Sequence, residues 1–196
     1  PVLHSVVPLP LGDRQQKGIL VPTKAALTLL GPKGEAVWRC HLPDEPAGAP
    51  AVADANGDGT MEIVQPLASS ILCIDQEGKV LWSLDAPAGV NSGVVVADVT
   101  GDPTPEILAG DGDGGVTCWS GKERLWYVLL DNAYRPEGLD PFTSRMTYWG
   151  GYHRNRDISA ALAAGDVDGD GKSEIIVATE PGYLWRLSGE GEALSL

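Results

Sequence analysis

Residues 166–177 read DVDGDGKSEIIV, and two other parts of the chain repeat this pattern. They are ADANGDGTMEIV at residues 53–64 and ADVTGDPTPEIL at residues 97–108. In each, an Asp follows a short apolar run, polar side chains recur at the third and fifth positions counted from that Asp, and a Glu at the ninth position begins a new apolar run. Self-similarity of this kind is typical of repeat proteins, so the repeat unit is the first feature to define.

The repeat extends well beyond the acidic stretches. The leading residues Asp54, Asp98 and Asp166 are 44 and 68 residues apart, so the second interval holds one repeat plus an insertion of about 24 residues. Trp82 and Trp126 each follow their leading Asp by 28 residues. The first 45 residues have the same ending without the acidic stretch. We therefore expect one unit over residues 1–196 with four repeats, at about 1–45, 46–89, 90–156 with the insertion at 127–156, and 157–196.

Composition favours short strands over helices. The 196 residues include 25 Gly and 15 Pro, which both disfavour helix interiors. Each repeat holds four short apolar runs separated by turn residues, the pattern of a four-stranded antiparallel sheet. Packing such sheets around a common axis would cover both faces of each sheet, as in a β-propeller. The prediction is an all-β fold, a β-propeller of four-stranded antiparallel blades; independent hairpins or a sandwich remain the alternatives.

The acidic stretches have the chemistry of calcium sites. Ca²⁺ takes six to eight oxygen ligands, and alternate residues of a tight loop can turn their oxygens toward one point. The seventh position would contribute its backbone carbonyl. The expected ligands, for two to three Ca²⁺ sites, are Asp54, Asn56, Asp58, Thr60, Glu62, Asp98, Thr100, Asp102, Thr104, Glu106, Asp166, Asp168, Asp170, Lys172 and Glu174.

The three sites are not expected to be equal. The stretch that begins at Asp166 has four carboxylates and the favourable Gly171, so it ranks first. The stretch at Asp54 has three carboxylates. The stretch at Asp98 also has three, but Pro103 replaces the glycine and fixes the backbone φ angle, so it ranks third. The alternative is that Asp, Asn and Gly form ordinary β-turns here without any metal.

The stretch at 166–177 and its two relatives resemble the FG-GAP/VCBS calcium-loop repeats of β-propellers, such as the heads of integrin α-subunits. The resemblance covers nearly the whole chain except the insertion. It implies blade hairpins held by structural rather than catalytic Ca²⁺. Propellers of this kind mostly have six to eight blades, so four repeats would close alone, pair with a second chain, or form part of a larger ring. Self-association or further blades are thus among the expected partners.

Charge narrows the range of partners. The net charge of −13 argues against nucleic acid. Ten of the 27 acidic residues lie in the three acidic stretches, which leaves a net charge of −3 for the rest of the chain.

No apolar run reaches the roughly 20 residues of a membrane-spanning helix, so no membrane insertion is expected. The three cysteines have no metal-site spacing, and Cys73 and Cys118 are expected to be buried.

The insertion is the expected ligand-binding segment. Long insertions on rigid scaffolds often carry function, and this one concentrates aromatic residues with arginine. The candidate ligand-binding residues are Arg145, Tyr148, Trp149, Tyr152, His153 and Arg154. The alternative is that the insertion packs on a neighbouring blade or subunit.

The expected function is an extracellular, calcium-stabilised binding, adhesion or scaffold module for carbohydrate or protein ligands. Millimolar calcium outside cells fits weak sites, so the expected location is extracellular, at the cell surface or periplasmic. Standard hydrolase and phosphate-binding motifs are missing, and no catalytic residues are assigned. The enzymatic alternative is a polysaccharide lyase on a calcium propeller, with Tyr148, Tyr152 or His153 as base beside Arg145 or Arg154.

Overall fold

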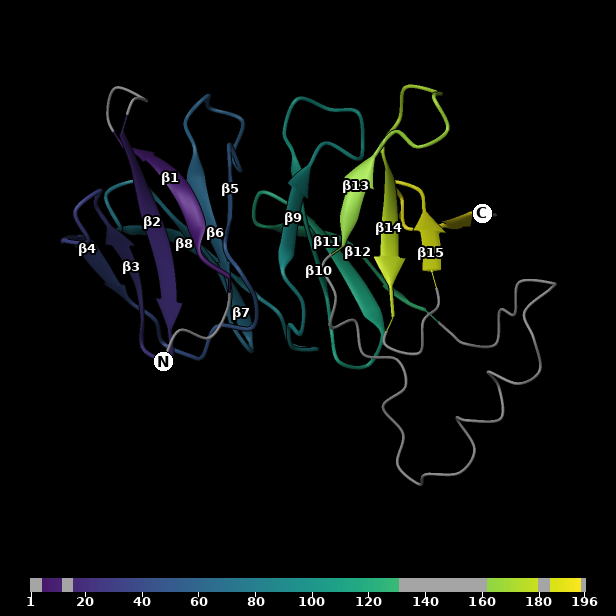
Figure 1. The fold of residues 1–196 in the computed structure, drawn as a ribbon. Helices are drawn as coiled ribbons and strands as arrows, with labels where there is room; N and C mark the ends of the chain where they lie inside the picture. The colour runs from purple at the N-terminus through teal and green to yellow at the C-terminus, as the bar shows by residue number, and fades with distance from the viewer. Residues whose placement is uncertain (1–4, 12–15, 131–161, 180–183, 195–196) are drawn as a thin grey trace.

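The computed structural model describes residues 5–11, 16–130, 162–179 and 184–194 (Figure 1). Within these ranges every regular element is a strand. The strands are β1 (Val7–Leu11), β2 (Gln16–Thr23), β3 (Ala26–Leu30), β4 (Ala36–His41), β5 (Ala51–Ala53), β6 (Glu62–Pro66), β7 (Ser70–Ile74), β8 (Val80–Asp85), β9 (Val94–Ala97), β10 (Glu106–Gly110), β11 (Gly115–Ser120), β12 (Glu123–Leu129), β13 (Ala163–Gly165), β14 (Glu174–Ala178), β15 (Leu184–Leu187) and β16 (Ala193–Leu194).

The strands form four antiparallel sheets of four strands each, here called sheets 1 to 4. Sheet 1 contains β1 to β4, sheet 2 contains β5 to β8, sheet 3 contains β9 to β12 and sheet 4 contains β13 to β16. In every sheet the strand order follows the sequence, so each sheet is a meander. The predicted all-β fold of four-stranded antiparallel sheets is confirmed.

The sheets stand face to face in sequence order (Figure 1). Three hydrophobic clusters join them, one between sheets 1 and 2, one between sheets 2 and 3, and one between sheets 3 and 4. Among the described residues no cluster joins sheet 1 to sheet 4, and Figure 1 shows these two sheets at opposite ends of the row. The row is therefore open at both ends.

The in-phase tryptophans lie between sheets rather than deep inside one. Trp38, Trp82 and Trp126 are half-buried, and each packs against the edge of one of the three hydrophobic clusters. The indole N–H of Trp38 donates to the carbonyl of Gln76 at 2.8 Å, and that of Trp126 donates to the carbonyl of Gly189 at 2.7 Å. Each of these two rings covers the turn before the last strand of the next sheet, so it ties neighbouring sheets together.

The other expectations about the core hold. Cys73 and Cys118 are buried free thiols, and Cys40 is as well. The segment at Asp111 and Asp113 is the turn between β10 and β11. Asp111 is only 2% exposed, and it accepts hydrogen bonds from two backbone amides and from the hydroxyl of Tyr127. In the part of the chain that the structure describes, no helix is long and apolar enough to cross a membrane.

Candidate metal loops at one end of the sheets

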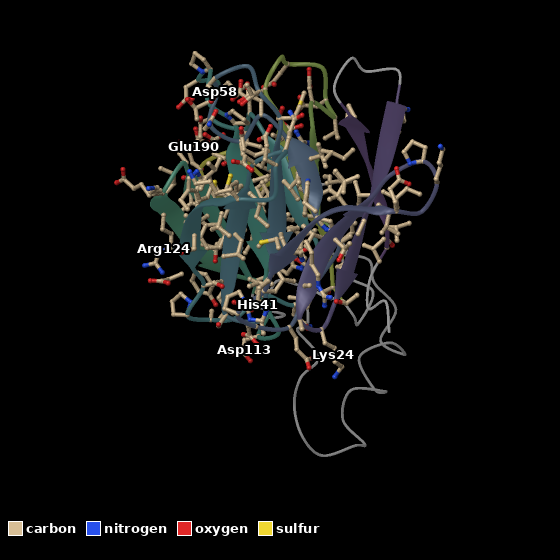
Figure 2. The ribbon with its side chains drawn as sticks, turned by 90° about the vertical axis from the view of Figure 1, so that its left-hand side faces the viewer. Lys24, His41, Asp58, Asp113, Arg124 and Glu190 are labelled. Atoms are coloured by element: carbon tan, nitrogen blue, oxygen red, sulfur yellow. The ribbon has the colours of Figure 1, made fainter. Side chains whose placement is uncertain are left out.

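Three acidic loops connect the first and second strands of sheets 2, 3 and 4. They are loop 2 (residues 54–62), loop 3 (residues 98–106) and loop 4 (residues 166–174). All three lie at the upper end of the row in Figure 1. In Figure 2, Asp58 of loop 2 lies at this end, whereas Lys24, His41 and Asp113 lie at the opposite end. The repeat therefore places its three acidic loops at one end of the molecule (Figure 1).

Each loop ends in a glutamate that is buried and bound to the loop backbone. Glu62, Glu106 and Glu174 are 2%, 0% and 4% exposed. In each, Oε2 accepts a hydrogen bond from the amide of the loop's second residue, at 2.9 Å in loops 2 and 3 and 3.0 Å in loop 4. This hydrogen bond offsets part of the cost of burying the carboxylate, and it fixes where each loop enters its second strand.

The leading aspartates of loops 2 and 4 hold the loop backbone in the same way. Asp54 accepts hydrogen bonds from the amides of Asp58 at 3.0 Å and Gly59 at 2.8 Å. Asp166 accepts from the amides of Gly169 at 2.6 Å and Gly171 at 3.0 Å. Gly59 and Gly171 have φ angles of 87° and 89°, a conformation that disfavours side chains, so glycine is the residue suited to these positions.

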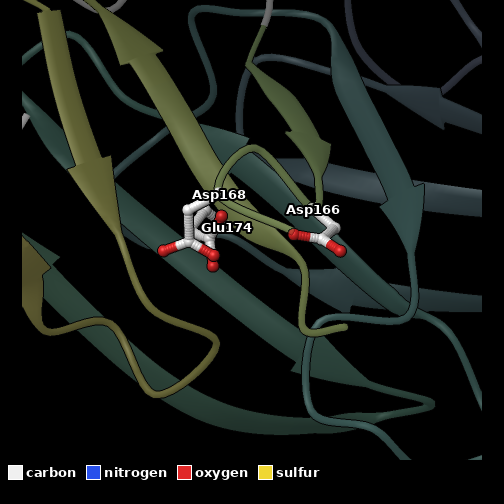
Figure 3. Close-up of side chains that lie close together, drawn as sticks. All are labelled: Asp166, Asp168 and Glu174. Carbon is white, nitrogen blue, oxygen red and sulfur yellow. The ribbon is translucent and has the colours of Figure 1, made fainter. Parts of the chain in front are cut away.

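Loop 4 brings three carboxylates to one point. Ligand atoms of Asp166, Asp168 and Glu174 all lie within 4.8 Å of one another (Figure 3). Among the described residues this is the one group of three or more acidic, histidine or cysteine side chains that meets this spacing. Hard carboxylate oxygens at such separations are the donor set that Ca²⁺ prefers, so these residues fit a calcium ion. Asp170 does not belong to the group; its Oδ1 accepts from the amide of Lys172.

Loop 2 joins its acidic residues through a hydroxyl. The Oγ1 atom of Thr60 lies 2.6 Å from Oδ1 of Asp58 and 2.9 Å from Oε1 of Glu62. The side-chain amide of Asn56 donates to Asp58 at 3.0 Å. Hydrogen bonds from Thr60 and Asn56 hold the pKa of the Asp58 carboxyl below its ordinary value. In loop 2, neutral donors thus orient the Asp58 carboxylate and favour its ionised form.

Loop 3 differs around Pro103. The amide of Thr104 donates to Asp102 at 2.7 Å, and the Thr100 hydroxyl lies 3.1 Å from Oε1 of Glu106. Asp98 accepts one backbone hydrogen bond, from Gly101 at 2.7 Å. The leading carboxylate therefore holds one loop amide, whereas its counterparts in loops 2 and 4 each hold two.

Sequence reasoning missed one residue at loop 4. Arg186 of β15 donates a hydrogen bond from Nη2 to Oδ2 of Asp168, and the same nitrogen lies 3.6 Å from Oε2 of Glu174. The hydrogen bond to Asp168 and the nearby carboxylates raise the pKa of the guanidinium. The sequence did contain a signal of the strand position of Arg186. Arg186 precedes the turn glycine Gly191 by five residues, and Cys73 precedes the turn glycine Gly78 by the same number, so the two side chains occupy equivalent strand positions.

A cavity of about 560 Å³ opens at the loop end of the sheets. Its lining includes Asp98 and Thr100 of loop 3, several residues of loop 4, and Arg186 and Glu190. The six candidate ligand residues, Arg145, Tyr148, Trp149, Tyr152, His153 and Arg154, lie outside the described residues.

Comparison with known families agrees with this geometry. Residues 160–193, which contain loop 4, match the model of the FG-GAP repeat. Residues 68–133, from sheet 2 through sheet 3, match the model of the lambda-carrageenase β-propeller domain. The chain is made of β-propeller blades and carries an FG-GAP repeat. FG-GAP repeats commonly bind calcium, and propeller and FG-GAP domains together suggest a binding or scaffold module.

Solved structures with this propeller fold are longer. BBS1N, in a crystal structure with ARL6DN, matches with a TM-score of 0.64 at 12% identity, over 97% of this chain and 52% of its own. BamB from Moraxella catarrhalis matches with a TM-score of 0.58 at 14% identity, over 98% of this chain and 48% of its own. The chain thus spans about half the length of these structures. No curated protein sequence matches it significantly.

Proposed function

We propose that this chain is a calcium-stabilised propeller module that works outside the cytoplasm and binds a carbohydrate or protein ligand. The observation that carries the proposal is the convergence of Asp166, Asp168 and Glu174 within 4.8 Å at the end of sheet 4. Loops 2 and 3 repeat the same design, with a buried glutamate bound to the loop backbone. Two to three calcium ions would then be shared among three neighbouring loops.

Calcium suits these loops better than magnesium. The donors are carboxylates, hydroxyls and carbonyls of a short loop, and Ca²⁺ accepts six to eight such oxygens in irregular geometry, whereas Mg²⁺ demands a smaller octahedron and keeps several waters. The role is structural, because each loop connects the first two strands of its sheet. Sites of moderate charge fit the calcium concentrations outside cells, which supports an extracellular, cell-surface or periplasmic location.

The proposal that the chain binds a ligand rests on the propeller scaffold and not on a known binding-site motif. Propeller blades hold loops on a rigid frame, where binding residues are commonly placed. The cavity at the loop end of the sheets offers one concave surface. The aromatic and arginine residues of the insertion at 127–156 remain the proposed contacts to a carbohydrate or protein.

Thermal unfolding tests the calcium proposal. A ligand that binds the folded state stabilises it, so millimolar calcium should raise the unfolding midpoint by several degrees relative to chelator. The substitutions Asp54→Asn and Asp166→Asn should each reduce this rise. The measured quantity is the difference between calcium and chelator, because both aspartates also hold the loop backbone.

Asp113→Asn is the matched control. It removes one charge at the end of the molecule opposite the acidic loops (Figure 2), so the rise with calcium should persist. A midpoint that is equal in calcium and in chelator would contradict calcium stabilisation.

The match to a carrageenase propeller domain keeps a polysaccharide-acting enzyme as the second candidate. A lyase would use Tyr148, Tyr152 or His153 with Arg145 or Arg154. Incubation with acidic polysaccharides should release unsaturated products that absorb ultraviolet light if the chain is a lyase. Flat absorbance together with retained polysaccharide binding would favour the binding module.

A further inference from the structure

Arg186 stands where the other sheets have a small or apolar residue. In the strand registers, Val64 pairs with Cys73, Leu108 with Cys118, and Ile176 with Arg186. The first residue of each pair lies two positions after the loop glutamate. The three partners are therefore equivalent positions on the third strands of sheets 2, 3 and 4.

At this position the side chain faces the following sheet. Cys73 packs in the cluster shared by sheets 2 and 3, and Cys118 packs in the cluster shared by sheets 3 and 4. Arg186 consequently projects from the face of sheet 4 that points away from sheet 3. Its side chain is only 18% exposed, because it lies against the end of its own loop.

The guanidinium reaches two of the three clustered carboxylates. It donates to Asp168 and lies 3.6 Å from Glu174, whose side chain is 5% exposed. In the described part of the chain, the carboxylates of loops 2 and 3 have no Lys or Arg at ion-pair distance. Their glutamates lie beside the hydroxyls of Thr60 and Thr100 instead. Loop 4 alone, among the described loops, has a built-in cation.

We propose that Arg186 is a tethered counter-ion of loop 4, and that it makes this loop bind calcium more weakly than loop 2 although loop 4 has more carboxylates. The inference rests on the proposed calcium binding. A guanidinium beside Asp168 and Glu174 already satisfies part of their charge, and a divalent ion at the same oxygens would meet its repulsion. The order of affinities is then set by Arg186 rather than by the number of acidic residues.

A calcium titration followed by two-dimensional NMR separates the loops. The backbone amides of Gly57 and Gly59 report on loop 2, and those of Gly169 and Gly171 report on loop 4. In the unaltered protein, the loop 2 signals should shift at lower calcium than the loop 4 signals. Arg186→Met keeps a long apolar stem and removes the charge, so the loop 4 midpoint should fall about three- to tenfold, with loop 2 unchanged.

Two further variants keep the test decisive. Arg124→Met makes the same substitution on β12, at an exposed side chain that has no ion pair with any of the described residues, and it should leave both midpoints unchanged. Arg186→Lys retains the charge and should give a smaller change than Arg186→Met. If the NMR spectrum of Arg186→Met shows that this variant does not fold, Arg186→Lys replaces it in the titration.

The possible failures are distinguishable. If loop 2 binds calcium but the loop 4 midpoint is the same with arginine, lysine and methionine at position 186, or already lies below that of loop 2 in the unaltered protein, the counter-ion role is overturned. If no glycine signal of any loop responds up to millimolar calcium, the proposed calcium function fails first.

Discussion

Burial of a polar side chain is the central cost of each acidic loop. Glu62, Glu106 and Glu174 are almost completely removed from water, and each is held by a backbone amide of its own loop. A side chain completes each environment: a threonine hydroxyl donates to the glutamate in loops 2 and 3, and the guanidinium of Arg186 lies 3.6 Å from Glu174 in loop 4. The glutamate is therefore tied to its loop by the protein's own donors.

Buried thiols make stability sensitive to alkaline pH. Burial raises the pKa of Cys73 to about 12, with nearby Glu62 and Asp75 adding to it. Burial, with Glu106 beside it, raises the pKa of Cys118 to about 12 as well. The unfolded thiols release their protons near 9.0, so the folded state holds them more tightly. The stability they contribute is complete below that pH and is lost as pH rises toward 12.

The expected result is a urea midpoint that falls between pH 8 and pH 10.5. Each thiol should lower the unfolding free energy by up to about 1.4 kcal/mol for each pH unit above its unfolded pKa. Other groups titrate in this range, so the comparison is with a Cys73→Ala, Cys118→Ala double variant, in which the fall should be shallower. Equal slopes in the two proteins would show that the thiols do not titrate differently on folding.

At the scale of elements, a glycine turn and a tryptophan form the joint between sheets. Gly34 and Gly78 occupy equivalent turns, with φ angles of 80° and 85°. A Cβ atom added to Gly78 would lie 2.7 Å from the ring of Trp38, whereas one added to Gly34 would meet no atom within 4 Å. The two positions share the same backbone strain and differ in the packing of a neighbouring sheet.

This difference predicts unequal effects of one substitution. Gly34→Ala should cost only the strain of a left-handed backbone, on the order of 1 kcal/mol. Gly78→Ala should cost about 1–3 kcal/mol more, because it forces Trp38 off the turn. Chemical denaturation of both variants measures the difference, with tryptophan fluorescence as a second readout. If both variants unfold at the same denaturant concentration, the indole does not support the joint.

The repeat made most of this architecture readable from the sequence. The acidic loop, the turn and the tryptophan recur at the same spacing in successive repeats. This spacing alone predicted the four-stranded sheets and the positions of the acidic loops. The position of Trp38 between sheets did not, because an apolar residue in a strand pattern says that it is buried but not against what. Arg186 was missed because its partners are 18 and 12 residues away along the chain, and only the strand register brings them together.

The whole molecule is a row in which each sheet packs on its sequence neighbours. Stability in such arrays is close to a sum of units and nearest-neighbour interfaces. Leu20 is fully buried in the cluster between sheets 1 and 2. Leu20→Ala should cost about 2–5 kcal/mol locally and should speed amide exchange in β2, β3 and their contacts in sheet 2.

Hydrogen exchange read by mass spectrometry tests how far this loss spreads. Peptides from β14, two interfaces away, should keep their protection. Ile175→Ala, at a fully buried residue in the cluster between sheets 3 and 4, supplies the reciprocal variant, in which β14 should be affected and β2 spared. A uniform acceleration across all four sheets in both variants would show a single cooperative unit instead.

The open ends of the row also bear on how the molecule would respond to force. In the part of the chain that the structure describes, sheets 1 and 4 each pack against one neighbouring sheet, whereas sheets 2 and 3 each pack against two. A chain stretched between its termini should peel from the outside inward. Sheets 1 and 2 would release similar lengths of polypeptide, whereas the detachment of sheets 3 and 4 would also release the chain between β12 and β13, so one rupture step should be longer than the others.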